Sequence, residues 1–125
     1  MDLSRFDTRQ AAEAGVDVPL VIDGETVMGD DGNPITFHIK GMAEEGVHAA
    51  VLKGINAPGK TPKDVLENDM RVLRAAVAGW SNNFTVAGEK LPYSRENVDK
   101  VMAVSEVRVA VASEVFNKAN FMPKP

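Results

Sequence analysis

The chain has 125 residues, a formal net charge of −4, 44% hydrophobic and 26% charged residues, and no cysteine. This length and composition predict one globular domain with its own core. The lack of cysteine excludes disulfides, thiolate metal sites and a cysteine nucleophile. The scattered basic residues argue against nucleic-acid binding, and no signal peptide or membrane-spanning run is recognisable. We therefore expect a cytoplasmic protein that binds neither nucleic acid nor membrane.

The first forty residues predict a weak helical turn followed by two strands. Residues 6–14 favour the turn, and 16–22 form a β-rich run in which Pro19 suits an edge strand. A dense turn signal at 30–34 leads into 35–40, where apolar and polar residues alternate as in a half-buried strand. The two strands are expected to form a hairpin, which needs helices packed against it to be stable.

The middle of the chain predicts two helices joined by a loop. Residues 42–52 favour a short helix, and 54–60 form a Gly/Pro-rich loop. Thr61 followed by Pro62 is typical of a helix N-cap and first helical position. Apolar residues then recur at steps of four and three, which predicts one stripe along about four turns of helix. This stripe consists of Leu66, Met70, Leu73, Val77 and Trp80.

The last third predicts an irregular connection over 79–92 and then helix, with Ser94 as its N-cap. Residues 98–116 are rich in valine and alanine, and their apolar side chains fall on more than one face. Whether 98–119 is one helix or two stays open. A helix that is apolar on two faces needs partners on both. The candidate protein-binding surface on it consists of Val98, Val101, Met102, Val109, Val115 and Phe116.

Residues 54–61 match the G-x-x-x-x-G-K-[ST] pattern of a phosphate-binding loop. In that motif the backbone N–H groups cradle phosphate, the lysine neutralises it and the hydroxyl holds Mg²⁺. Here a helix-like segment precedes the loop where a buried strand is required, and the proline after Thr61 removes an N–H beside the anion site. We expect a loop that runs into a capped helix. Nucleotide binding is the weaker interpretation, and its residues would be Gly54, Gly59, Lys60 and Thr61.

No other pattern predicts catalysis, a metal or a cofactor. His38 and His48 lack a third ligand at metal spacing, and Asp30 and Asp31 lack the remaining ligands of a calcium loop. No nucleophile with an accompanying base is recognisable. We expect a protein that is not an enzyme.

Three segments of the C-terminal half are distinctive: Gly-Trp-Ser at 79–81, Leu-Pro-Tyr-Ser-Arg-Glu-Asn-Val at 91–98, and Asn-Lys-Ala-Asn-Phe at 117–121. Together they resemble the tail assembly chaperones of long-tailed bacteriophages. The residues that carry the resemblance are expected to be mainly structural: Trp80 as a core anchor, Asn97 reaching back to the helix cap, Asn120 ending the last helix. The full set is Trp80, Pro92, Tyr93, Ser94, Asn97, Asn120 and Phe121.

The resemblance implies a non-catalytic assembly factor of the siphophage type, either the shorter of two frameshift products or their shared N-terminal domain. Such a protein binds the tape-measure protein, recruits tail-tube subunits and self-associates. It acts in the cytoplasm of the infected host and is not expected in the mature virion. A minor structural tail or head–tail connector protein is the alternative, and a small P-loop-like nucleotide-binding protein is the second alternative.

For the fold, the patterns predict a single α+β domain over residues 1–125. An N-terminal β-hairpin or small antiparallel sheet, at about 16–40, is expected to pack against a C-terminal helical half of about four helices, at about 42–121.

Overall fold

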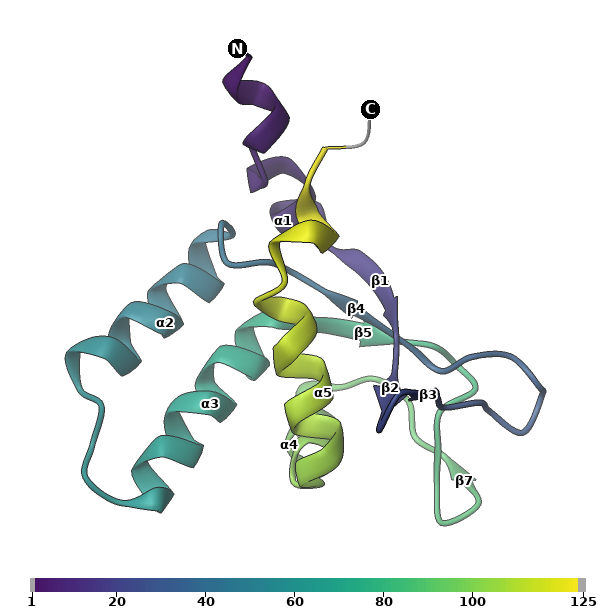
Figure 1. The fold of residues 1–125 in the computed structure, drawn as a ribbon. Coiled ribbons are helices and arrows are strands. Elements are labelled where there is room, and N and C mark those ends of the chain that lie inside the picture. The colour runs from purple at the N-terminus through teal and green to yellow at the C-terminus, as the bar shows by residue number, and fades with distance from the viewer. Residues whose placement is uncertain (1, 124–125) are drawn as a thin grey trace.

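The computed structural model describes residues 2–123 and confirms an α+β fold that is 49% helical and 18% strand. In this part of the chain the α-helices are α1 (Arg9–Ala14), α2 (Glu45–Asn56), α3 (Pro62–Ala76), α4 (Arg95–Met102) and α5 (Ser105–Val115). Short 3-10 helices are η1 (Leu3–Phe6) and η2 (Lys118–Phe121). The strands are β1 (Val16–Pro19), β2 (Val21–Ile22), β3 (Glu25–Thr26), β4 (Thr36–Ile39), β5 (Val77–Trp80), β6 (Thr85–Val86) and β7 (Glu89–Lys90). The predicted helical half contains four of the α-helices (Figure 1).

The central sheet is antiparallel and has the order β1-β4-β5. Strands β1 and β4 are the pair that the alternation predicts, with Val18 opposite Phe37. The third strand, β5, comes from the C-terminal half. This corrects the predicted apolar stripe, because α3 ends at Ala76 and both Val77 and Trp80 lie on β5. The free edge of β4 offers backbone hydrogen-bonding groups, with which the β-branched Val77 and its neighbours can pair. If α3 continued through these residues instead, the groups on β4 would stay unpaired.

The core lies between the sheet and the helices α3, α4 and α5. Phe37 and Ile39 on β4 have no exposed surface, and Leu73 on α3 is 1% exposed. Residues 98–116 form two helices that break at Ala103 and Val104, so each helix turns an apolar side inward. The guanidinium of Arg108 donates a hydrogen bond to the carbonyl of Met102 at the end of α4 (2.8 Å). No helix within 2–123 is both long and apolar enough to cross a bilayer.

Aromatic residues fasten the 81–92 connection to the edge of the sheet. The Trp80 ring meets Phe37 and Tyr93 edge to face, with centroids 5.9 and 5.2 Å apart. The indole N–H of Trp80 donates to the carbonyl of Leu91 (2.8 Å), and the Tyr93 hydroxyl donates to the carbonyl of Val77 (3.0 Å). Trp80 is therefore a structural anchor, but from a strand rather than from the predicted helix.

The two remaining segments of the resemblance also make local structural contacts. Ser94 Oγ caps α4 by accepting from the backbone N–H of Asn97 (3.1 Å), and Asn97 Nδ2 donates to the carbonyl of Pro92 (2.8 Å). At the other end, Asn120 Nδ2 donates to the backbone and the carboxylate of Glu114 (2.9 and 2.7 Å). Asn120 thus ties η2 to α5 and does not end α5. Phe121, 2% exposed, packs onto the core.

We expect Tyr93→Phe to lower the free energy of unfolding by about 1 kcal/mol, because the Val77 carbonyl loses its donor while the ring stays in place. Urea unfolding followed by tryptophan fluorescence measures this difference. The control Phe6→Leu changes an exposed aromatic residue and is expected to shift stability by less than about 0.5 kcal/mol. Equal stabilities for Tyr93→Phe and the wild type would show that this bond does not hold the connection.

Candidate functional site on the α2–α3 hairpin

The structure corrects the candidate protein-binding surface predicted on 98–116. Val109 and Phe116 are exposed, at 66% and 46%. The other four side chains belong to the core, because the two short helices present them to the sheet and to α3. These buried residues are Val98, Val101, Met102 and Val115.

The segment that matches a phosphate-binding loop is a helix cap. Gly54 lies inside α2 instead of in a loop after a strand. The carboxylate of Asp64 accepts hydrogen bonds from the backbone N–H groups of Lys60 and Thr61 (3.1 and 3.3 Å), and Thr61 Oγ1 accepts from the N–H of Asp64 (3.2 Å). In this capping box an internal carboxylate accepts hydrogen bonds from the N–H groups that would face phosphate in a phosphate-binding loop. The cap predicted at the start of α3 is therefore present, and Asp64 occupies the N–H groups of Lys60 and Thr61.

The glycine and the acid of this cap depend on each other. Gly59 has φ of 77°, and a Cβ atom placed there would clash with the side chain of Asp64. The hydrogen bonds, chiefly the one from the N–H of Lys60, hold the pKa of Asp64 below its ordinary value. The glycine that suggested a phosphate site is thus required by the close approach of Asp64.

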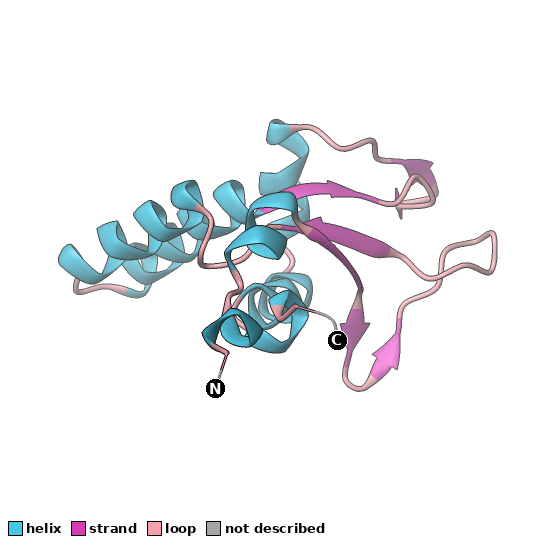
Figure 2. Cartoon of the chain, turned by 90° about the horizontal axis from the view of Figure 1, so that it is seen from above, coloured by secondary structure: helices cyan, strands magenta, loops and turns pink. Residues whose placement is uncertain are grey.

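Helices α2 and α3 pack against each other as an antiparallel hairpin that extends away from the sheet (Figures 1 and 2). Glu44 caps α2 by accepting from the N–H groups of Gly46 and Val47 (2.9 and 3.0 Å). Large apolar side chains are exposed along this hairpin at 41–66% of their surface. They are Leu52, Ile55, Val65 and Leu66. The hairpin is therefore one part of the fold whose apolar surface the domain itself leaves uncovered.

One face of the hairpin carries an apolar groove of about 390 Å³. We call it the apolar groove. Ile55 from α2, Val65 from α3 and Phe116 after α5 line it and are exposed. Among the described residues that line it, Asp69 is the single charged one. The groove thus presents mainly hydrocarbon to a partner.

A neighbouring face carries a larger groove, of about 590 Å³, between α2, α3 and the start of α4. We call it the basic groove. Small apolar side chains contribute to its lining: Ala49, Ala50, Ala75 and Val98. Its charged residues are Lys53, Arg71, Arg74, Arg95, Glu96 and Asp99. Positive charge predominates there although the whole chain is acidic.

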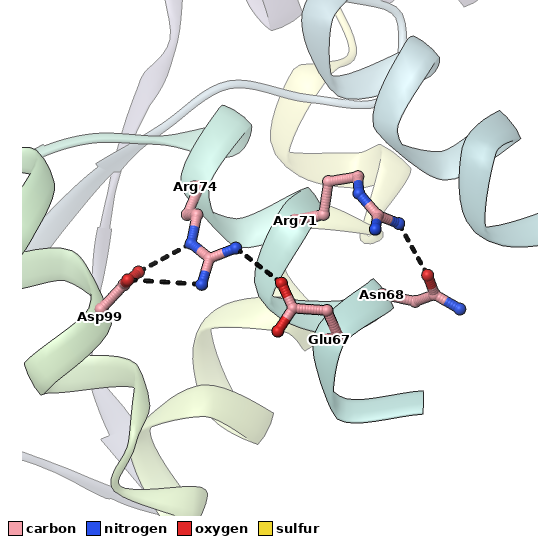
Figure 3. A network of polar contacts seen from close by, with 5 residues as sticks. All are labelled: Glu67, Asn68, Arg71, Arg74 and Asp99. Atoms are coloured by element: carbon pink, nitrogen blue, oxygen red, sulfur yellow. Dashed lines mark hydrogen bonds and ion pairs between the residues drawn. The ribbon is translucent and has the colours of Figure 1, made fainter. Parts of the chain in front are cut away.

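A network of polar contacts crosses the basic groove from α3 to α4 (Figure 3). Arg74 binds both carboxylate oxygens of Asp99 (2.8 and 3.3 Å) and reaches Glu67 with its third nitrogen (3.1 Å). The hydrogen bonds to Asp99, and then the one to Glu67, raise the pKa of Arg74 above its ordinary value. Because these groups are well exposed, the ion pairs add little stability, but the bidentate contact of Arg74 with Asp99 orients α4 on α3.

The residues of the basic groove escaped the sequence-based prediction because they come from three helices. The available signal was the spacing of Gly46, Ala49, Ala50 and Lys53, which places small residues and one cation along a single face of α2. That signal became meaningful only once α3 and α4 were known to lie beside it.

Comparison of the chain with protein-family models, with curated proteins and with solved structures finds no match. The likeness to tail assembly chaperones therefore stays a prediction that rests on the sequence segments described above.

We expect Asp64→Asn to lower the thermal midpoint at neutral pH, because the amide is a weaker acceptor for the N–H groups at the start of α3. The folded-state pKa of Asp64 is lowered, so its charge stabilises the fold above the unfolded-state pKa, and this stabilisation is lost as pH falls through the folded-state pKa. The two midpoints should therefore converge as the pH falls below about 4. Thermal unfolding from neutral to acidic pH tests this, with Asp69→Asn, farther along α3, as the control. A difference that does not change with pH would contradict the prediction.

Proposed function

We propose that this protein is a non-catalytic assembly chaperone of a bacteriophage tail, which binds the tape-measure protein and recruits tail-tube subunits. The observation that supports this best is the apolar groove on the projecting α2–α3 hairpin. Ile55 and Val65 are 66% and 53% exposed there, although the domain has a well-filled core. An uncovered apolar surface of this kind typically receives a partner.

The shape of the groove suits a helical partner. A hairpin of two packed helices offers ridges and grooves into which the apolar side chains of a third helix can fit. Ile55, Val65 and Phe116 surround the apolar groove, so a helix with an apolar stripe would cover all three at once. A tape-measure segment, expected to be a long helix with exposed apolar residues, has the required chemistry.

The groove is small, so a single contact would be weak. A volume of about 390 Å³ holds only a few side chains. Many copies bound along one rod would gain affinity through self-association, because each bound copy raises the effective concentration of the next. We therefore propose that bound copies of the protein also associate with one another.

We expect co-expression with fragments of the tape-measure protein from the same genome to keep those fragments soluble and to recover them in a pull-down. The double variant Ile55→Asp and Val65→Asp should reduce recovery by about tenfold, because it places two charges where apolar contact is needed. Val86→Asp changes a similarly exposed residue on the β6–β7 hairpin and should have no effect. Circular dichroism should show that the variants keep the wild-type fold. Tape-measure binding that is absent from the wild type, or unaffected by the double variant, would refute this assignment.

We expect the protein to be absent from purified mature phage particles, because an assembly chaperone leaves when the tail is complete. Quantitative mass spectrometry of particles and of infected-cell lysate measures this, with the tail-tube protein as the internal reference. Detection at a fixed, near-stoichiometric ratio to the tube would instead support a minor tail or connector protein.

A further inference from the structure

The basic groove concentrates positive charge on an acidic protein. The chain has 14 basic and 18 acidic residues, yet four basic and two acidic residues line this one groove. The four cations come from α2, α3 and α4, so they surround the groove from three helices. A local excess of one charge favours a partner of the opposite charge.

Three of these cations are free to meet such a partner. Arg74 is engaged by Asp99 and Glu67, as shown in Figure 3. Within residues 2–123, Lys53, Arg71 and Arg95 form no ion pair with a carboxylate, and Arg71 donates to the neutral side chain of Asn68 (2.7 Å). Bringing a carboxylate to these three would therefore break no existing ion pair.

The small apolar side chains between the cations decide what kind of anion fits. Ala49, Ala50 and Ala75 leave room for another helix to approach α2 and α3 closely, and they offer it an apolar contact. A nucleic-acid backbone would cover this hydrocarbon without contributing apolar atoms of its own. The lining therefore favours an amphipathic protein helix.

We propose that the basic groove is a second docking site, which receives an acidic amphipathic helix of a partner protein. Small apolar residues of that helix lie against Ala49, Ala50 and Ala75, and its carboxylates pair with Lys53 on one side and Arg71 on the other. On the α4 side of the groove, Glu96 and Asp99 repel the carboxylates of the docked helix, so Arg95 is the residue there that can form an ion pair with them. The contact along α2, from Gly46 to Lys53, is about 10 Å, or two turns of helix.

This site is separate from the apolar groove that supports the proposed function. The two grooves share Ala50, but they use different exposed side chains. The docking of an acidic helix does not require that the partner be a tape-measure protein. Each proposal can therefore fail without the other.

A synthetic peptide tests the inference. The probe is a fluorescein-labelled helical peptide of about 18 residues, with an alanine and leucine stripe flanked by glutamates. The matched peptide has lysine at every glutamate position. Fluorescence anisotropy should show binding of the glutamate peptide that is about tenfold tighter than that of the lysine peptide and that weakens as salt is raised. Equal affinity for the two peptides, or no binding of the glutamate peptide, would overturn the proposal.

Charge reversal at the site supplies the residue-level test. The triple variant Lys53→Glu, Arg71→Glu and Arg95→Glu should weaken binding of the glutamate peptide by about tenfold or more and improve binding of the lysine peptide. The charge-matched control reverses three exposed cations elsewhere, Arg9, Lys63 and Lys90, and should leave binding within about twofold of the wild type. Equal weakening by both triple variants would show a nonspecific charge effect and refute the site.

Three further measurements keep the outcome clear. If the triple variant does not fold, the single variant Arg71→Ala replaces it, and the peptide is also mapped by NMR on the wild-type protein. Peptide-induced shifts at Ala49, Ala75 and Val98 support the site, and shifts confined to other residues refute it. The double variant Ile55→Asp and Val65→Asp should bind the glutamate peptide like the wild type, which separates this site from the apolar groove. A single-stranded oligonucleotide that displaces the peptide at lower concentration than unlabelled peptide would identify the groove as a nucleic-acid site instead.

Discussion

The pairing of β5 with β4 is the constraint on which the rest of the fold depends. The N–H of Lys40 donates to the carbonyl of Ala76, and the N–H of Ser81 donates to the carbonyl of Thr36 (2.8 and 2.9 Å), so bonds at both ends of β5 join distant parts of the chain. This pairing satisfies backbone groups that a longer α3 would leave exposed at the sheet edge. It also brings Trp80 onto Phe37, which closes the aromatic end of the core.

The same constraint explains why the α2–α3 hairpin projects. Because α3 must end where β5 begins, its C-terminal part is held by the core, with Leu73 almost fully buried. Its N-terminal part extends beyond the sheet and has α2 as its main neighbour. The hairpin consequently has free faces, one lined by apolar side chains and one by cations. The residues proposed to bind partners are thus distinct from Trp80 and Tyr93, which carry the sequence resemblance and hold the sheet edge.

The cap at the start of α3 shows how a sequence motif can arise from local structure alone. A tight turn into a helix needs a residue that tolerates positive φ, an oxygen that accepts from the first N–H groups, and an acid near the positive helix end. Gly59, Thr61 and Asp64 meet these needs. A phosphate-binding loop presents the same kind of N–H groups outward, so glycine and threonine recur in that loop and in this helix cap. The difference is that here a carboxylate of the chain itself accepts from those N–H groups.

The sequence by itself determined those features that depend on contacts between near neighbours. The caps at Thr61 and Ser94 and the alternation along β4 were predictable, because hydrogen bonds and periodicity within a few residues define them. Only the tertiary structure decided where α3 ends, that Val98 and Met102 are buried, and that Lys53, Arg71 and Arg95 share one groove. A step of three or four residues fits a helix whether or not a distant strand competes for its end, and an apolar stripe does not say which surface will cover it. Those choices depend on long-range backbone pairing and on the packing of helices from different parts of the chain.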